Sequence, residues 1–385
     1  MKSILFISYT YLNGNGGGVY ASQAFINALA EICDSITVIC PQKKGKTAEN
    51  ISQKVKFVYA DYDISKFQKI LLRIIGRIHF MTSVFKKEIK LQKYDTVIFN
   101  SSLCSSGLIN TARKYNCKII TIHHNFEQEY IRDNSAGIER IIHLRQSIKA
   151  EKTSVLKSDL NLTLTSDDKE LLYKYYDKSR QSRIEVIGCF ENNGRTHPRT
   201  MNNKTRQNRF VITGNLSAVQ TYESLVPWIK NYYPILKDAC HNAKLTIAGK
   251  NPSDTIMRMC EENDVEVIKN PATMIPVLEK ADYYICPTAL GGGLKLRIMD
   301  GLGAGMPVLT HKVSGRGYED FLDSCLFTYH DIPSFKKALI KMLTCSINSQ
   351  QIQEEYLKTF SFESGKKRFA KLLSTLNQEN MRSIK

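Results

Sequence analysis

The stretch that decides the fold is Gly291-Gly292-Gly293-Leu294-Lys295-Leu296-Arg297-Ile298-Met299-Asp300, which leads into Gly305-Met306-Pro307-Val308. Three glycines let backbone N–H groups approach an anion closely, and the first turn of a following helix adds its positive dipole end. Lys295 and Arg297 offer charge to phosphate oxygens, while Asp300 can accept hydrogen bonds from ribose or sugar hydroxyls. The stretch therefore predicts a site for a nucleotide diphosphate, although a glycine-rich turn between a strand and a helix also occurs without a ligand.

Short apolar strands alternate with helical segments on both sides of this stretch. We expect strands at 4–8, 35–40, 56–59, 96–100, 118–123, 160–165 and 184–187, and again at 209–213, 244–248, 266–268, 283–286 and 307–310. Helices are expected between the strands, among them 137–157, 223–238 and 295–304. Strands separated by helices imply parallel βαβ units. The predicted fold class is α/β, with two doubly wound Rossmann-like domains that face each other across a cleft.

A polar stretch interrupts this alternation between residues 189 and 208. It is rich in Asn, Arg, Thr and Lys and contains Pro198. We therefore expect a first domain at 1–190, a linker at 191–208 and a second domain at 209–350. The C-terminal helices, 351–385, could pack back on the first domain.

The composition is that of a globular chain, with 385 residues of which 42% are hydrophobic and 24% charged. The ten cysteines form no CxxC pair and no zinc-like spacing, so we expect reduced thiols and no metal. A net charge of +17 favours anionic partners. No apolar run reaches the roughly 18 to 20 residues of a transmembrane helix. These features predict a cytoplasmic protein whose contact with a membrane would be peripheral, at its inner face.

A glycine-rich loop follows the first expected strand and ends at Gly16, Gly17 and Gly18. Its spacing is not the G-x-G-x-x-G fingerprint, and no acidic residue ends the second strand, which disfavours a nicotinamide cofactor. Two interpretations stay open: a tight turn with a purely structural role, or a loop that contacts a ligand through Gly17 and Gly18.

Polar residues gather after the strand at 118–123, where His124, Asn125 and Glu127 occur together. A neutral imidazole can accept or donate a proton near pH 7, and the two neighbours could orient it or bind hydroxyls. A histidine can also be a satisfied structural residue. Because carboxyl ends of strands bind ligands in α/β sheets, we favour a ligand-binding role for His124.

The first strand of the second domain also ends in a glycine, Gly214, followed by Asn215. Gly214 would let the backbone come close to a ligand, or it could simply end the strand.

The segment 65–93 carries eight basic residues and one acidic residue, Glu88, between apolar residues at helical spacing. A helix with a buried apolar side and a solvated cationic side is one interpretation. Docking on an anionic membrane or a lipid-linked diphosphate is the other.

In order and spacing, the second half resembles the nucleotide-sugar domain of retaining glycosyltransferases of the two-Rossmann GT-B fold, most closely family 4, the glycosyl transferases group 1. Members commonly show Gly-Asn-Leu-Ser, here 214–217, and Gly-x-Gly-x-(Arg/Lys)-x-Lys-x-x-Glu-Ala, here 291–301, before Ala-x-Gly-x-Pro-Val, here 303–308. The N-terminal glycine loop and the segment 124–127 look like that family's acceptor-domain features. The first half matches only at these short motifs.

The resemblance implies that Lys295 and Arg297 contact the donor diphosphate, with the usual Arg and Lys exchanged. It implies that Asp300 replaces the glutamate that holds the ribose, and an aspartate is one methylene shorter. Gly292 stands where many members carry a further glutamate, which leaves open how the transferred sugar is held. Such enzymes generally need no divalent metal.

The leading hypothesis is a hexosyltransferase of surface polysaccharide biosynthesis that uses a nucleotide diphosphate sugar, with a UDP-sugar favoured. Its catalytic residues would be Lys295, Arg297 and His124. A glycan or lipid-linked glycan acceptor would bind at Asn125 and Glu127. The donor would bind at Gly17, Gly18, Gly214, Asn215, Gly292, Gly293, Leu294, Lys295, Arg297 and Asp300. No cofactor and no metal are expected.

Two alternatives stay open. One is a nucleotide-sugar epimerase of the same fold, and the other is a non-enzymatic anion-binding protein. A nucleic acid partner is not expected, because aromatic residues are not interleaved with the basic runs as stacking platforms require.

Overall fold

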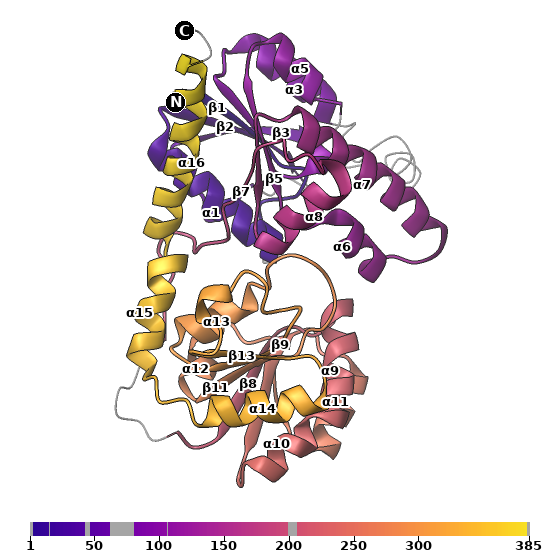
Figure 1. The fold of residues 1–385 in the computed structure, drawn as a ribbon, viewed down its shortest axis with the longest axis vertical. Coiled ribbons are helices and arrows are strands. Elements are labelled where there is room, and N and C mark those ends of the chain that lie inside the picture. The colour runs from indigo at the N-terminus through magenta and orange to yellow at the C-terminus, as the bar shows by residue number, and fades with distance from the viewer. Residues whose placement is uncertain are drawn as a thin grey trace. The chain divides into compact units, whose positions relative to one another are not determined.

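The computed structural model describes residues 3–14, 16–42, 47–61, 81–105, 107–198 and 206–382. The chain divides into two compact units. Unit 1 comprises Met1–Gly194 and Ser361–Lys385, and unit 2 comprises Arg195–Phe360. Each unit is built around one parallel sheet (Figure 1).

Unit 1 contains a seven-stranded sheet in the order β3-β2-β1-β4-β5-β6-β7, in which neighbouring strands pair in parallel. β1 pairs with both β2 and β4, so the strand order reverses direction between β1 and β4. That reversal is where doubly wound sheets bind ligands. The strands are β1 (Ser3–Ile7), β2 (Ser35–Gln42), β3 (Val55–Asp61), β4 (Thr96–Phe99), β5 (Lys118–His123), β6 (Leu160–Thr163) and β7 (Ile184–Val186).

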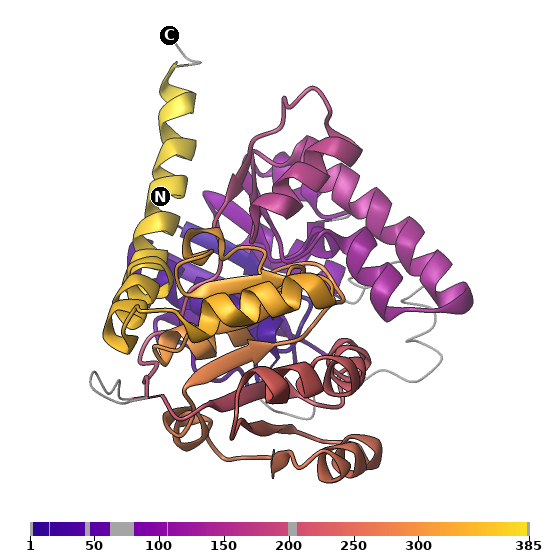
Figure 2. The same cartoon turned by 60° about the horizontal axis from the view of Figure 1, so that its bottom comes forward.

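Helices cover both faces of this sheet, as a parallel sheet requires. They are α1 (Gly17–Ile32), α3 (Thr82–Leu91), α4 (Ser102–Ser105), α5 (Ile109–Lys114), α6 (Glu127–Asn134), α7 (Gly137–Lys157), α8 (Ser166–Tyr176) and α16 (Phe362–Arg382). Figure 2 shows α6 and α7 extending away from the sheet. The C-terminal helix α16 packs on α1. A Cβ on Gly365 of α16 would lie 1.9 Å from Phe190 Cγ, so a glycine is needed for this close approach.

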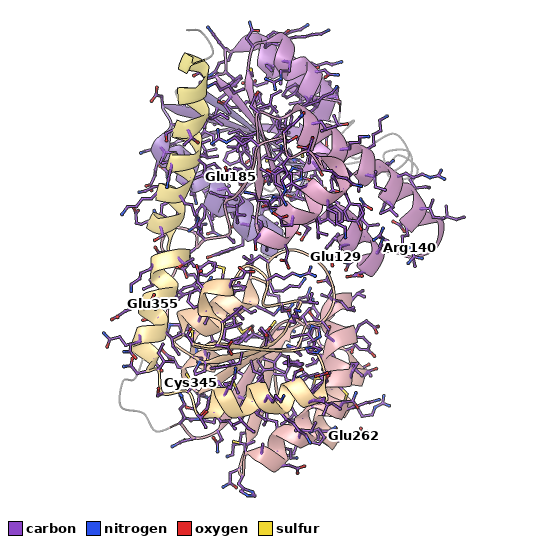
Figure 3. All side chains as sticks on the ribbon, viewed as in Figure 1. Glu129, Arg140, Glu185, Glu262, Cys345 and Glu355 are labelled. Atoms are coloured by element: carbon purple, nitrogen blue, oxygen red, sulfur yellow. The ribbon has the colours of Figure 1, made fainter. Side chains whose placement is uncertain are left out.

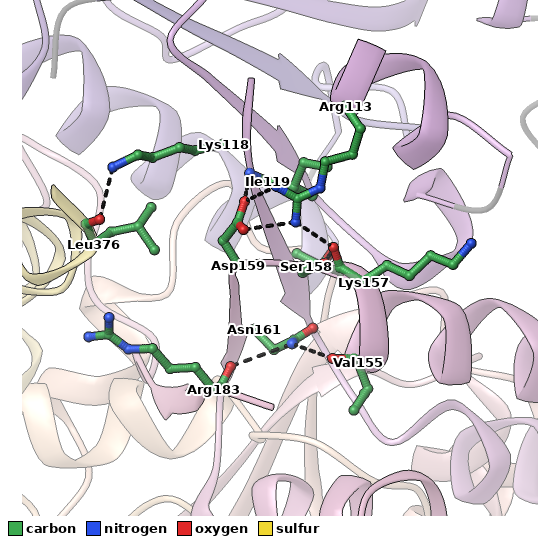
Figure 4. A network of polar contacts seen from close by, with 11 residues as sticks. Arg113, Lys118, Ile119, Val155, Lys157, Ser158, Asp159, Asn161, Arg183 and Leu376 are labelled. Carbon is green, nitrogen blue, oxygen red and sulfur yellow. Dashed lines mark hydrogen bonds and ion pairs between the residues drawn. The ribbon is translucent and has the colours of Figure 1, made fainter. Parts of the chain in front are cut away.

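A polar network ties the amino ends of β5 and β6 to the helices around them (Figure 4). Arg113 donates to both carboxylate oxygens of Asp159, at 2.9 and 2.8 Å, and Asp159 Oδ2 accepts from Ile119 N at 2.7 Å. Lys118 Nζ donates to Leu376 O of α16 at 2.9 Å. The amino edge of the sheet is thus fixed by charge-assisted hydrogen bonds, and the carboxyl edge carries the candidate ligand-binding residues.

Unit 2 contains a six-stranded parallel sheet in the order β10-β9-β8-β11-β12-β13, which reverses between β8 and β11. Its strands are β8 (Arg209–Asn215), β9 (Lys244–Lys250), β10 (Glu266–Lys269), β11 (Tyr283–Cys286), β12 (Val308–His311) and β13 (Leu326–Tyr329). Its helices are α9 (Val219–Asn231), α10 (Tyr233–Ala239), α11 (Asp254–Glu262), α12 (Ile275–Glu279), α13 (Arg297–Gly303), α14 (Ile332–Leu343) and α15 (Ser349–Phe360), with a 3-10 turn at Glu319–Phe321.

The core of unit 2 forms where α9 and α14 cover the sheet. Trp228 of α9 is 1% exposed and packs edge-on against Phe335 of α14, with ring centroids 6.3 Å apart. These rings belong to one apolar cluster that also includes strand residues such as Phe210 and Ile285. Burial of this cluster on folding is the main stabilisation of the unit.

The two doubly wound Rossmann-like domains predicted from the sequence are confirmed, but two helices in unit 2 differ from the expectation. The segment 223–238, expected to form one helix, forms parts of two. Helix α9 ends before Tyr232, and Pro234 lies in the first turn of α10. The helix expected from residue 295 begins at Arg297, which leaves Lys295 in the preceding turn. Of the segment 65–93, residues 65–80 lie outside the described residues. Within the described ranges, no helix combines the length and apolar character that crossing a bilayer requires.

Candidate functional site

In unit 2 the site is built at the strand reversal, where β8 and β11 end side by side. The Arg297 guanidinium lies directly against Gly214 at the end of β8. A Cβ on Gly214 would lie 2.9 Å from Arg297 Nη1, and its φ of +154° is one that other residues rarely adopt. Arg297 donates to Thr221 Oγ1 at 2.9 Å and to Thr288 Oγ1 at 3.3 Å. The guanidinium is therefore held by neutral hydroxyls, and none of its hydrogen bonds to a described residue goes to a carboxylate.

Lys295 organises the glycine turn that precedes α13. Its Nζ donates to the carbonyl oxygens of Gly291 and Gly292, each at 3.0 Å. Because a peptide group is planar and trans, carbonyls that point toward Lys295 turn the N–H groups of Gly292 and Gly293 the opposite way. Neither N–H makes a hydrogen bond to any residue in the described part of the chain. Successive amides of this kind form an anion-binding concavity, and Leu294 continues the turn.

Gln220, at the start of α9, supports the same turn, although no sequence motif predicts this role. Its Oε1 accepts from Lys295 Nζ at 3.4 Å. Its amide also fills the space beside Gly291, since a Cβ there would lie 2.2 Å from Gln220 Nε2. Gly291 has a φ of +81°, so a glycine is needed for both conformation and space. Nothing in the sequence around Gln220 marks it, because the contact depends on how α9 packs.

Asp300 lies on the first turn of α13 and accepts a hydrogen bond from Arg195 Nη2 at 2.6 Å through Oδ1. Its other oxygen, Oδ2, is contacted by Thr213 Oγ1 at 3.5 Å. Burial raises the pKa of Asp300, while the guanidinium groups of Arg195 and Arg297 act in the opposite direction. The residue predicted to hold a ribose is thus the partner of an arginine that the sequence analysis had assigned to the linker. Lone pairs on Oδ2 are the ones that can accept a ligand hydroxyl.

In unit 1 the site residues again follow the strand reversal, here between β1 and β4. His124, after β5, contacts Asn100 Oδ1 through Nε2 at 2.8 Å, and Asn100 follows β4. Since a carbonyl oxygen only accepts, Nε2 carries the proton, and in a neutral ring Nδ1 is then the acceptor. Burial, with a smaller contribution from His123, lowers the pKa of His124 to about 4. His124 is therefore a neutral acceptor at pH 7.

The tautomer of His124 is linked to the N-terminal glycine loop through two side chains. Asn100 Nδ2 donates to Ser22 Oγ at 2.7 Å, and Ser22 Oγ donates to Gly18 O at 2.6 Å. Gly16 is the N-cap of α1 and provides no side-chain cap, so the first-turn amides at Gly17 and Gly18 receive no such bond. The structure thus connects Gly18 and His124, which lie far apart in the sequence. Ser22 and Asn100 carry no motif, and the sequence analysis missed both.

Asn125 and Glu127, the predicted acceptor residues, have different surroundings. Asn125 is partly exposed, whereas Glu127 is 8% exposed at the start of α6. The Glu127 amide donates to Glu151 Oε1 at 2.8 Å, and Tyr176 donates to Glu151 Oε2 at 2.7 Å. Burial, together with the nearby charge of Glu127, raises the pKa of Glu151 well above its ordinary value. Glu151 therefore fixes the backbone at the start of α6, where Glu127 lies.

Asn215 ends β8 with its side chain turned to its own loop, where Oδ1 accepts from Ser217 Oγ at 2.9 Å. Among the residues described, no group of three or more His, Cys, Asp or Glu side chains is arranged to hold a metal ion. Whether the chain works without a metal stays a prediction.

Residues 207–345 match the family model described as glycosyl transferases group 1. No curated protein sequence matches the chain. The matched region begins just before β8 and ends after α14, so it contains the glycine turn, Lys295, Arg297 and Asp300.

Solved structures match nearly the whole chain at low sequence identity. The sucrose-phosphate synthase of Thermosynechococcus elongatus has a TM-score of 0.75 at 14% identity, covering 98% of this chain and 100% of its own. The lipopolysaccharide outer core galactosyltransferase WaaB has a TM-score of 0.64 at 14% identity, covering 97% and 99%. HepE of Anabaena, in complex with UDP, has a TM-score of 0.65 at 13% identity, covering 97% and 100%. At these identities the likeness establishes the fold.

Proposed function

We propose that this chain, a glycosyltransferase of group 1 with the GT-B fold, transfers a hexose from a nucleotide diphosphate donor to a glycan with retention of configuration. The observation that carries the proposal is the turn at Gly292 and Gly293. Its amides point away from Lys295 and have no partner among the described residues. A diphosphate would satisfy them. The UDP in the HepE complex favours uridine as the base.

The chemistry needs positive charge where the donor breaks. When the bond between the anomeric carbon and the phosphate oxygen is cleaved, negative charge develops on the leaving diphosphate. Donors fixed in advance around that charge provide the largest available stabilisation. Arg297 supplies positive charge directly, and the turn amides add dipoles without reorganising. Lys295, whose Nζ bonds to the carbonyls on the other side of the turn, orients these amides and adds its charge through the turn. Arg297 donates hydrogen bonds to Thr221 and Thr288 rather than to a carboxylate, although its charge also acts on nearby Asp300.

Retention fits a reaction in which the acceptor attacks from the face that the diphosphate leaves. The acceptor hydroxyl forms the new C–O bond and passes its proton to an oxygen of the leaving phosphate. No side chain then has to serve as the base. His124, with a pKa near 4, is a poor base but a good acceptor for a sugar hydroxyl through Nδ1. We assign it to sugar binding.

For Asp300 we propose ribose binding through Oδ2, with Arg195 orienting the carboxylate through Oδ1. The bond to Arg195 fixes the Asp300 side chain, so less side-chain entropy is lost when the ribose binds. This gain in binding free energy offsets the shorter reach of an aspartate.

The acceptor is proposed to be a lipid-linked glycan of a surface polysaccharide, bound by unit 1 near Asn125 and presented at the cytoplasmic face of the membrane. All ten cysteines are free thiols, as expected of a protein in a reducing compartment. The net charge of +17 favours an acceptor that carries phosphate.

The testing experiment follows the nucleotide and the product together. Purified protein is screened against UDP-, GDP- and ADP-sugars for thermal stabilisation, and the stabilising donor is incubated with extracted glycolipid. We expect nucleotide release only with acceptor, and a product whose anomeric configuration matches that of the donor by NMR. Inverted configuration would refute retention. Conversion of the donor sugar without acceptor would refute transfer in favour of epimerisation.

A further inference from the structure

Helix α7 is buried along one side and exposed along the other. Its buried residues are His143, Ser147, Ala150, Glu151, Ser154 and Val155. The opposite side carries exposed residues spaced three or four apart, so that they form one line along the helix. These residues, which we call the outer face of α7, are Ile138, Ile141, Arg145, Lys149, Lys152 and Leu156.

The outer face of α7 is unusually apolar for a surface helix. Ile138 is 76% exposed, Ile141 52% and Leu156 51%. A solvated helix normally places charged and polar residues on the side away from the core. Here three large aliphatic side chains occupy that side. Single exposed residues need no explanation, but three in one line do.

The charges on this face all have one sign. Arg145, Lys149 and Lys152 are exposed, and none forms an ion pair with any residue that the structure describes. The acidic residues of α7, Glu139 and Glu151, lie off this line, and Glu151 is fully buried. Figure 3 shows the labelled Arg140 toward the outer end of α7, away from the sheet. An unpaired cationic and aliphatic surface fits a partner that is anionic and apolar at once.

Helix α3 offers the comparison, because it is the described part of the basic segment 65–93. Its apolar residues Phe85 and Ile89 are buried in the core of unit 1. Its exposed residues include Lys86, Lys87 and Lys90, and Leu91, four positions after Lys87 at the end of the helix, is its single exposed large hydrophobic, where α7 has three. Helix α3 is thus an ordinary amphipathic helix with a solvated cationic side.

We propose that the outer face of α7 docks on an anionic lipid bilayer, with Ile138 and Ile141 entering the headgroup region and the three cations contacting lipid phosphates. Each Lys or Arg near an anionic surface adds electrostatic attraction, and burial of the aliphatic side chains adds a hydrophobic contribution to the free energy of binding. A second copy of the chain fits less well, since an isologous contact would oppose like charges. The proposal does not depend on the identity of the donor.

The test is sedimentation with vesicles of phosphatidylcholine alone or with about 30% phosphatidylglycerol, using the full chain. Three variants are compared. The first combines Ile138→Ser with Ile141→Ser, and the second combines Arg145→Gln, Lys149→Gln and Lys152→Gln. The charge-matched control combines Lys86→Gln, Lys87→Gln and Lys90→Gln on α3. Thermal stabilisation by UDP, measured on each variant, reports the donor site independently of the membrane.

We expect the wild type to bind the anionic vesicles and release them at high salt. The two α7 variants should lose at least about ten-fold in partition coefficient, while the α3 control changes less than about three-fold. Equal loss in the control, or unchanged binding in the α7 variants, would overturn the proposal. So would a wild-type dimer in sedimentation velocity that the isoleucine variant abolishes, since the face would then be a contact between copies.

Discussion

The Arg297 guanidinium occupies the space that a side chain at Gly214 would need, with Nη1 only 2.9 Å from the position of a Cβ. The two residues come from opposite sides of the strand reversal, one at the end of β8 and the other on α13. The arrangement keeps a cation beside the carboxyl ends of the strands, hydrogen-bonded to the hydroxyls of Thr221 and Thr288 rather than to a carboxylate.

Gly214→Ala should displace the guanidinium and weaken nucleotide diphosphate binding by roughly ten-fold or more, because a charge-assisted phosphate contact contributes on the order of 1.5 to 3 kcal/mol. The measurement is the calorimetric dissociation constant in a double-mutant cycle. In an Arg297→Ala background the same glycine substitution should cost less, since the clash with the guanidinium is gone and only the backbone strain at a φ of +154° remains. Additive losses would show that Gly214 acts independently of Arg297.

Gln220→Glu should impair donor binding more than Gln220→Ala. The alanine removes a 3.4 Å contact to Lys295 and the packing on Gly291, for which we expect roughly a five-fold weaker affinity, or about 1 kcal/mol. The glutamate adds a negative charge beside the lysine and the anionic donor, so the loss should exceed ten-fold and diminish at high salt. Affinities are compared at low and high ionic strength. If both variants bind as the wild type does, Gln220 has no part in the turn.

Asn100→Asp should raise the pKa of His124, because a carboxylate beside the ring favours the protonated form. With the wild-type pKa near 4, the acidic limb of kcat/KM should lie well below neutrality. In the variant this limb should move upward by one unit or more, and activity near pH 6 should fall. Asn100→Ala serves as the control that removes the contact without adding charge. A pH profile unchanged by the aspartate would contradict the assigned tautomer and role.

Stability should fall as the pH drops from about 6.5 to 4. His123 is 2% exposed, contacts Asn161 at 3.0 Å, and burial lowers its pKa to about 4. Below its unfolded pKa the unfolded chain binds the proton more readily, so the free energy of unfolding rises with pH in this range. A shift of this size corresponds to about 3 kcal/mol. Urea unfolding of His123→Gln should show a shallower pH dependence. If the free energy of unfolding depends equally on pH in both proteins, groups other than His123 cause the acid sensitivity.

Chelation should leave transfer unchanged. The proposed site supplies positive charge through Lys295 and Arg297 and dipoles through the turn amides, which leaves no step for a divalent cation. Initial rates with and without excess EDTA measure this directly. A loss of activity that is restored by added Mg²⁺ or Mn²⁺ would contradict the proposed metal independence.

The sequence predicts much of the fold, because apolar runs mark buried parallel strands regardless of what lies between them. The strands at 118–123 and 283–286 and the helix at 137–157 have the bounds that the structure shows. The break between α9 and α10 was missed, since an apolar pattern continues through Tyr232 and Pro234 is tolerated in a first helical turn. Where a helix begins or ends depends on the backbone conformations that its residues allow more than on the spacing of its apolar residues.

The candidate site was predictable only where glycines and charges are adjacent in the chain. The turn at 291–297 could be identified because its residues are neighbours. Gln220, Asn100 and Ser22 could not, because each reaches its partner only after strand register brings separate segments together. Arg195 was assigned to a linker on composition, and its partner Asp300 lies 105 positions away. Polar contacts of this kind follow from tertiary packing.

The most direct test of the central claim is the affinity of the chain for UDP, GDP and ADP, measured by calorimetry for the wild type and for Lys295→Ala with Arg297→Ala. We expect the wild type to bind at least one nucleoside diphosphate. The double variant, with an unchanged circular dichroism spectrum, should bind the same nucleotide at least about a hundred-fold more weakly, a loss of roughly 2.7 kcal/mol. Equal affinity in the two proteins would contradict the assignment of the glycine turn as the donor diphosphate site.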